Sequence, residues 1–123
     1  MSLETIEAKA FVPAKDMEVS KHFYVDLGFD LTWTGDDLAQ FECGPSKFLL
    51  QHFYSAEHAN NFMMSLLVAD CDAWWQRVVD RKLVERYGVR AKPPEDQPWG
   101  MRDFPLTDPA GVLWRIGHDL PRR

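Results

Sequence analysis

The sequence predicts an α+β fold in which a βαβββ module occurs twice within one domain spanning residues 1–123. In each half, a strand-like run leads to an aspartate, Asp16 or Asp70, and a helical pattern follows it. Three short strand-like runs come after each predicted helix. A length of 123 residues fits one compact domain with a sizeable core. We expect the first module at about residues 4–55 and the second at about residues 61–118.

The first module begins with a half-buried strand, because apolar residues alternate with polar ones from Ile6 to Val12. Asp16 is a suitable N-cap for the helix that follows, and Gly28 is a suitable end. The apolar positions of this helix recur at helical spacing, at Val19, Phe23 and Leu27. Three strands are then predicted at residues 29–34, 38–43 and 47–54, separated by turns at residues 36–37 and 44–46.

The second module opens with a nearly continuous apolar run at residues 62–69, which is typical of a strand covered on both faces. Asp70 is the predicted cap of a helix with Trp75, Val79 and Leu83 on one stripe. Weaker strand patterns follow at residues 89–92 and 101–106. Residues 108–111, Asp-Pro-Ala-Gly, predict a tight turn before a last strand at residues 112–116.

Composition argues against several classes of function. No apolar run reaches about 18 residues and no signal-peptide pattern is present, so we expect no membrane partner. A net charge of −5 argues against nucleic acid as a partner, because phosphate binding requires clustered Lys and Arg. The two cysteines are too few for a disulfide framework, and the four histidines lack the spacing of a site. We therefore expect a cytoplasmic protein.

Two segments resemble signatures of the vicinal oxygen chelate superfamily, which includes glyoxalases, bleomycin resistance proteins and dioxygenases. Residues 16–29 resemble its first-helix signature, Asp-x-x-x-Ser-x-x-Phe-Tyr-x-x-Leu-Gly-Phe. Residues 108–111 resemble the Asp-Pro-x-Gly turn before its last strand. The resemblance covers essentially the whole chain. It implies a U-shaped mixed sheet around a concave cleft, with two chains paired as a homodimer.

Within the superfamily, the loop around Trp99 most resembles bleomycin resistance proteins. Those proteins carry Gln-Pro-Trp-Gly-Arg-Glu-Phe before the same turn, whereas residues 97–104 here have Met101 inserted and Asp103 in place of Glu. The resemblance implies a protein that sequesters a small aromatic, glycopeptide-type or other antibiotic-like molecule in a cleft of the dimer. A glyoxalase- or dioxygenase-type metalloenzyme is the alternative, and a non-catalytic scaffold with a vestigial cleft is a third possibility.

Metal chemistry depends on four strand positions. Superfamily enzymes hold a divalent metal there with His, Gln or Glu, and the equivalent residues are Lys9, Gln51, Met63 and Arg115. Lys and Arg place positive charge beside the cation, and a Met thioether is a poor ligand for a hard cation. We therefore expect no metal, no cofactor and no catalytic residue. A register shift of one residue would bring other side chains to these positions and favour the metalloenzyme.

The cleft lining follows from strand alternation. If those four positions face the concave side, Phe11, Leu49, Phe53 and Leu113 share it, and a second set packs under the helices: Phe48, Leu50, Leu66, Val68, Trp114 and Ile116. The candidate ligand-binding residues are Trp33, Leu38, Gln51, Phe53, Met63, Trp99, Arg102 and Arg115.

The two tryptophans in this set have two interpretations. Trp33 and Trp99 match aromatic residues of the bleomycin resistance cleft and would stack on a planar or cationic ligand. Alternatively, Trp33 covers a sheet edge and Trp99 pins its own loop. Leu38 stands where those proteins often have another aromatic residue. Lys9 and Arg115 favour an anionic or carbonyl-bearing group, which conflicts with a purely cationic ligand.

Overall fold

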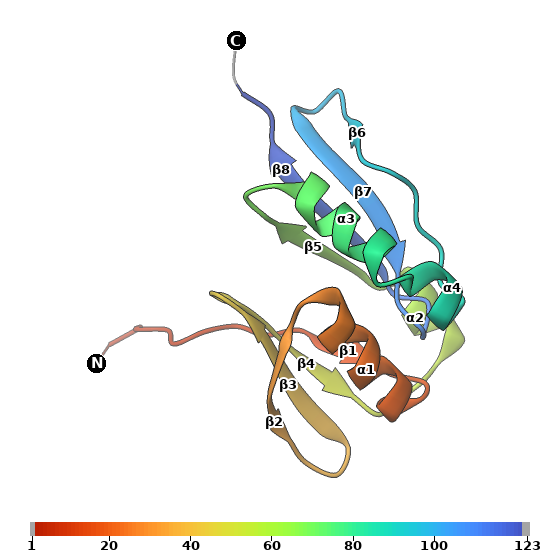
Figure 1. Cartoon of the computed structure of the whole chain (residues 1–123). Helices are drawn as coiled ribbons and strands as arrows, with labels where there is room; N and C mark the ends of the chain where they lie inside the picture. Colours follow the sequence, from red (N-terminus) through yellow and green to blue (C-terminus); the bar gives the residue numbers. More distant parts are fainter. Residues whose placement is uncertain (1, 122–123) are drawn as a thin grey trace.

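The computed structural model describes residues 2–121 and consists of two modules that pack together through their helices (Figure 1). The first module contains β1 (Phe11–Pro13), α1 (Met17–Leu27), β2 (Asp30–Thr34), β3 (Leu38–Cys43) and β4 (Ser46–Gln51). A short helix, α2 (Ala56–Asn61), leads to the second module. That module contains β5 (Met63–Leu67), α3 (Cys71–Asp80), α4 (Leu83–Tyr87), β6 (Glu95–Asp96), β7 (Met101–Thr107) and β8 (Leu113–Asp119).

Each module forms its own four-stranded mixed sheet, and the two sheets have equivalent strand orders. The first sheet runs β1-β4-β3-β2 and the second β5-β8-β7-β6. In each sheet the first strand pairs in parallel with the last, and the other pairs are antiparallel. The predicted duplicated α+β fold is therefore confirmed.

Both predicted helix starts are confirmed by capping hydrogen bonds. The Asp16 carboxylate accepts from the backbone N–H of Val19 at 3.2 Å. The Asp70 carboxylate accepts from the backbone N–H groups of Asp72 and Ala73 at 3.0 and 3.4 Å. These bonds satisfy N–H groups that the first turn of a helix leaves without intrahelical partners. None of the helices in residues 2–121 is long and apolar enough to cross a membrane.

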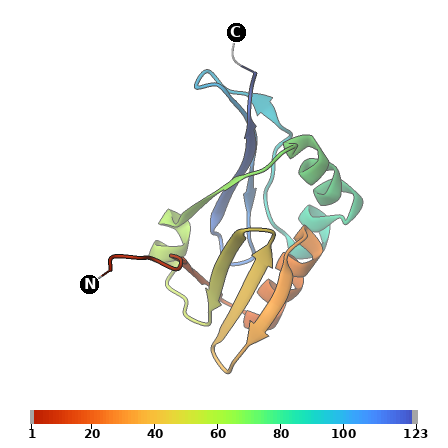
Figure 2. The same cartoon turned by 90° about the vertical axis from the view of Figure 1, so that its left-hand side faces the viewer.

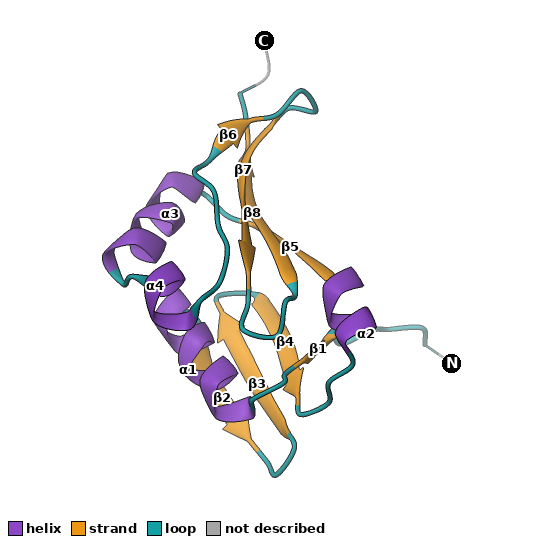
Figure 3. Ribbon diagram, turned by 90° about the vertical axis from the view of Figure 1, so that its right-hand side faces the viewer, coloured by secondary structure: helices purple, strands orange, loops and turns teal. Residues whose placement is uncertain are grey.

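One core joins the two modules. Helices α1, α3 and α4 lie along one side of the molecule with the sheets beside them, and α2 lies on the opposite side (Figure 3). Phe48 of the first sheet contacts Trp114 of the second, with ring centroids 5.2 Å apart. Tyr24 of α1 touches both rings. The modules therefore bury their apolar faces against each other as well as against their own helices.

The two signature segments meet in this core through hydrogen bonds. The Tyr24 hydroxyl donates to Asp108 Oδ2 at 2.5 Å and accepts from Trp114 Nε1 at 2.9 Å. Asp108 Oδ1 accepts the backbone N–H groups of Ala110 and Val112, each at 2.9 Å. Burial raises the pKa of Asp108, while these hydrogen bonds oppose the shift. The helix signature and the turn signature thus form one buried polar network.

Several strand predictions were wrong in extent. The alternating run from Ile6 forms a strand only at Phe11–Pro13, because the preceding residues project from the body of the molecule and Ile6 is 90% exposed (Figures 1 and 2). The fourth strand ends at Gln51 rather than at residue 54. The β5 strand is not covered on both faces, since Met63 and Leu67 are exposed.

The predicted second helix was also wrong in detail. It breaks after Asp80 because Lys82 adopts a left-handed conformation with φ 52°, and α4 starts afresh at Leu83. The buried residues of α3 are Cys71 and Val78, and Val79 is exposed. The strand predicted at residues 89–92 is reduced to a single bridge between Ala91 and Leu106. Helix α2 and strand β6 were not predicted.

Candidate ligand-binding site

Each sheet packs one face on the helices and core and leaves the other, here called the outer face, open. On the first sheet, the pairs Phe11–Leu49 and Leu38–Gln51 share the outer face, while Phe48 and Leu50 are buried beneath it. On the second sheet, register places these side chains on the outer face: Met63, Ser65, Met101, Asp103, Pro105, Leu113 and Arg115. The predicted alternation is therefore confirmed for Gln51, Met63 and Arg115, whereas Lys9 precedes β1 and has no strand register.

A hollow of about 230 Å³ on the outer face of the second sheet brings three predicted residues together, Met63, Trp99 and Arg115. Met63 is 58% exposed and Trp99 is 60% exposed, so both side chains offer apolar area to a ligand. Gly100, with φ 87°, turns the chain directly after Trp99. The loop therefore holds the indole at the rim of this hollow.

The floor of the hollow contains an ion pair that the sequence analysis missed. Asp103 is 4% exposed, and Arg115 Nη1 donates to both of its carboxylate oxygens at 3.4 Å. Gln97 Nε2 also donates to Asp103, at 3.0 Å. The positive charge of Arg115 is thus balanced by a buried carboxylate, although the guanidinium remains partly exposed. Period-two alternation from Met101 would have identified Asp103 as an outer-face residue.

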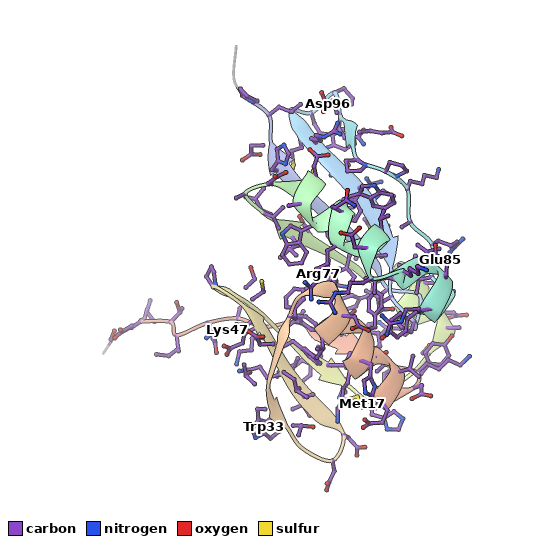
Figure 4. All side chains as sticks on the ribbon, viewed as in Figure 1. Met17, Trp33, Lys47, Arg77, Glu85 and Asp96 are labelled. Atoms are coloured by element: carbon purple, nitrogen blue, oxygen red, sulfur yellow. The ribbon has the colours of Figure 1, made fainter. Side chains whose placement is uncertain are left out.

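Three other predicted residues, Trp33, Leu38 and Gln51, lie on the outer face of the first sheet. Figure 4 shows Trp33 on the β2–β3 hairpin, directed away from α1. Its indole is 52% exposed and rests against Gly35, where an added Cβ would lie 2.9 Å from the ring. The hollow beside Arg115 is lined by second-module residues. Within one chain, the predicted ligand-binding residues therefore form two separate groups, one on the outer face of each sheet.

The structure does not place Arg102 and Phe53 with either half. Arg102 follows Met101 on β7, so alternation turns it to the helix face, where it pairs with Asp72 and Asp96 at 3.0 and 3.1 Å. These carboxylates raise the pKa of Arg102. Phe53 lies beyond the end of β4 and contacts the ring of His58. Alternation from Gln51 misplaces Phe53 because β4 ends at Gln51, whereas Arg102 was assigned by resemblance to bleomycin resistance proteins rather than by alternation.

The metal-equivalent residues do not fit a divalent cation. Lys9 Nζ lies 2.7 Å from Glu7 Oε1 and donates to Gln40 Oε1 at 2.5 Å, and the bond to Lys9 lowers the pKa of Glu7. Arg115 is committed to Asp103, and Met63 offers only a thioether. Within residues 2–121, no group of three or more His, Cys, Asp or Glu side chains is arranged to hold a metal ion. Two cations and a soft sulfur are the wrong ligand set.

A comparison with models of known protein families identifies the superfamily of this chain. The model of the Glyoxalase/Bleomycin resistance protein/Dioxygenase superfamily matches residues 6–116. The chain belongs to this superfamily. Both segments that resemble the superfamily signatures, residues 16–29 and 108–111, lie within the matched range, and the Tyr24–Asp108 hydrogen bond joins them.

Solved structures with the same fold include antibiotic-binding proteins. A bleomycin-binding protein complexed with bleomycin has a TM-score of 0.79 and 22% identity, over 94% of this chain and 99% of that one. A bleomycin-binding protein from Streptomyces verticillus, complexed with copper(II)-bleomycin, has a TM-score of 0.77 and 22% identity over 98% and 100%. An antibiotic-binding protein from Streptomyces sp. CB03234 has a TM-score of 0.73 and 26% identity over 98% and 100%. A search of curated protein sequences gave no match.

Proposed function

We propose that this protein is a metal-free binding protein that sequesters a small aromatic, antibiotic-like molecule in clefts formed between two copies of the chain. The observation that carries the proposal is the pair of open outer faces, one with Trp33 and the other with Trp99 beside the Arg115–Asp103 ion pair. Clefts that combine aromatic walls with a few fixed polar groups are typical of small-molecule sites. The similarity to antibiotic-binding structures supports this choice of ligand.

Pairing of two copies would complete the site. Phe11, Trp33, Met63, Leu67 and Trp99 are large apolar side chains exposed on or beside the outer faces. Exposed apolar area of this kind marks an interaction surface. In a symmetric dimer, the first sheet of one copy would face the second sheet of its partner, and two equivalent clefts would result.

In each of those clefts, one copy would supply Trp33, Leu38 and Gln51. The other copy would supply Met63, Trp99 and Arg115, so the two halves of the predicted site would surround one ligand. The charge balance at Arg115 favours a ligand with a neutral carbonyl-type acceptor, because the guanidinium keeps free N–H donors while Asp103 cancels its charge. No catalytic step is needed in such a site.

Tryptophan fluorescence titration with bleomycin and other flat aromatic antibiotics tests the proposal. We expect saturable quenching, and we expect Trp33→Ala and Trp99→Ala each to weaken binding by about 2- to 30-fold, the equivalent of about 0.5–2 kcal/mol per aromatic contact. Phe53→Ala, an exposed aromatic outside both outer faces, is the matched control and should bind like wild type. Absence of quenching by every compound would argue against the proposed ligand class.

Metal content tests the other half of the proposal. Protein purified without chelator should contain no stoichiometric divalent metal, because Lys9 and Arg115 occupy ligand positions. Stoichiometric Zn, Ni, Mn or Fe would contradict the proposal and favour the metalloenzyme.

A further inference from the structure

A second, roomier hollow lies away from Trp99, at the other end of the second module. Its volume is about 680 Å³, within the range typical of small-molecule sites. None of the eight residues predicted to bind ligand lines it. We call it the strap pocket, because one wall is the segment of residues 88–92, the strap, that runs beside β7 from α4 towards β6.

The strap is held firmly against the sheet. Gly88 ends α4 in a left-handed conformation with φ 65° and donates its N–H to Val84 O. Arg90 N–H donates to Thr107 Oγ1 at 2.9 Å, and Thr107 N–H donates to Arg90 O at 2.9 Å. Lys92 N–H donates to the carbonyl of Pro105 at 3.3 Å. These hydrogen bonds, three between backbone groups and one to the Thr107 side chain, fix one wall of the pocket.

The lining of the strap pocket combines apolar walls with two cations. Val84, Val89, Ala91 and Leu113 supply apolar surface. Arg90 and Lys92 flank Ala91 on the strand-like strap, so alternation directs their side chains to the same side. Within the described part of the chain, neither cation has a carboxylate oxygen within 4.0 Å.

Arg90 and Lys92 differ in this respect from Arg115 and Lys47, two other cations that line hollows and that do have carboxylate partners. Arg115 is bound to Asp103, and Lys47 lies near Glu7 and Glu42. Two unpaired cations beside an apolar cavity attract an anion, and the apolar walls stabilise a hydrophobic body attached to it. In a chain with a net charge of −5, this is a local reversal of charge.

We propose that the strap pocket is a second binding site, at the opposite end of the second module from the hollow beside Trp99, for a small molecule with an apolar body and one carboxylate or sulfonate group. The anionic group would lie against Arg90 and Lys92, and the apolar body would contact Pro105 and Leu113, which lie on the outer face of the second sheet. The strap pocket shares no lining residue with the hollow beside Trp99, although its Pro105 and Leu113 lie on the same outer face.

The fluorescent aromatic sulfonate 8-anilinonaphthalene-1-sulfonate is a suitable probe. The titration is made in the Trp99→Ala background so that the cleft contributes less to the signal. We expect the double substitution Arg90→Gln with Lys92→Gln to raise the Kd of the probe at least about fivefold, because it removes both cations. The control, Lys15→Gln with Lys21→Gln, changes net charge equally on the first module and should leave the Kd unchanged.

A second variant tests the cavity itself. Ala91→Phe keeps both cations and adds a bulky side chain to the pocket wall, where Ala91 pairs with Leu106 of β7, and we expect it to abolish probe binding. Thermal unfolding of each variant shows whether the fold is retained, which matters because the probe also binds loosened proteins. An unchanged Kd in the Arg90/Lys92 variant, or equal losses in that variant and the Lys15/Lys21 control, would overturn the proposal. The cleft proposal is tested separately. It would be contradicted if Trp33→Ala and Trp99→Ala left the fluorescence quenching by antibiotics unaltered.

Discussion

Replacing Tyr24 with Phe removes a single oxygen atom from the point where the two modules are hydrogen-bonded. That hydroxyl donates to Asp108 and accepts from Trp114, and all three side chains are buried. The phenyl ring of the variant would keep the aromatic contact with Phe48, whose centroid lies 4.8 Å away. The substitution therefore tests the hydrogen bonds with little change in packing.

The size of the effect follows from the groups left without a partner. The indole N–H of Trp114 loses the acceptor it has in the structure, and Asp108 keeps only its bonds from backbone N–H groups. A buried donor or acceptor without a partner costs about 1–3 kcal/mol, and more when it is charged. We expect Tyr24→Phe to lose about 3 kcal/mol of unfolding free energy, and Tm to fall by about 10 °C for a chain of this size.

Urea unfolding and thermal melts measure this loss. Tyr87→Phe is the matched control, because it removes a hydroxyl that donates to Asp26 at a partly exposed position of the same module junction. We expect the control to lose about 1 kcal/mol. If Tyr24→Phe unfolds at the wild-type midpoint, or loses no more than Tyr87→Phe, the buried network does not hold the modules together as argued.

Three further predictions concern titration and the ligand site. Burial raises the pKa of Tyr87 from 10.0 to about 12. The contribution of the protonated hydroxyl to the free energy of unfolding is therefore fully present below pH 10 and is lost as pH rises through 12. The urea midpoint of wild type should fall relative to that of Tyr87→Phe in this window. Asp103→Asn should leave Arg115 with an unbalanced positive charge. The ratio of the Kd values for an aromatic amide and the corresponding aromatic carboxylate should then shift in favour of the carboxylate by up to about fivefold, or about 1 kcal/mol, as measured by competitive titration. Gly35→Ala should displace the Trp33 ring, changing its fluorescence and the ligand Kd while the unfolding midpoint stays near that of wild type.

Local sequence signals predicted most of the fold. Asp16 and Asp70 cap helices because a short carboxylate after a strand satisfies the free N–H groups of a first turn. Alternation also predicted which faces of the sheets carry Gln51 and Arg115. These features depend on residues a few positions apart, so they can be derived without knowing the tertiary structure.

The errors arose where distant parts of the chain decide the outcome. The alternation of apolar and polar residues near Ile6 predicts a strand with one face buried. Within one chain, no other element covers the Ile6 side chain, which stays exposed. Arg102 was assigned to the cleft by likeness to other sequences, whereas pairing of β7 with β8 turns it towards Asp72. Asp103 was missed because its role depends on Arg115, which reaches it across the sheet. The strap pocket is formed by segments that no local pattern connects.

The central claim is that each ligand cleft takes Trp33 from one copy and Trp99 from the other, and mixing two binding-deficient variants tests it directly. Trp33→Ala and Trp99→Ala homodimers each lack one wall in both clefts. After subunit exchange, a mixed dimer would contain one complete cleft and one cleft without either indole. We predict that equimolar mixing restores high-affinity antibiotic binding at roughly a quarter of all clefts, the share expected for random symmetric pairing. A mixture that binds no better than the two separate variants would contradict the shared cleft.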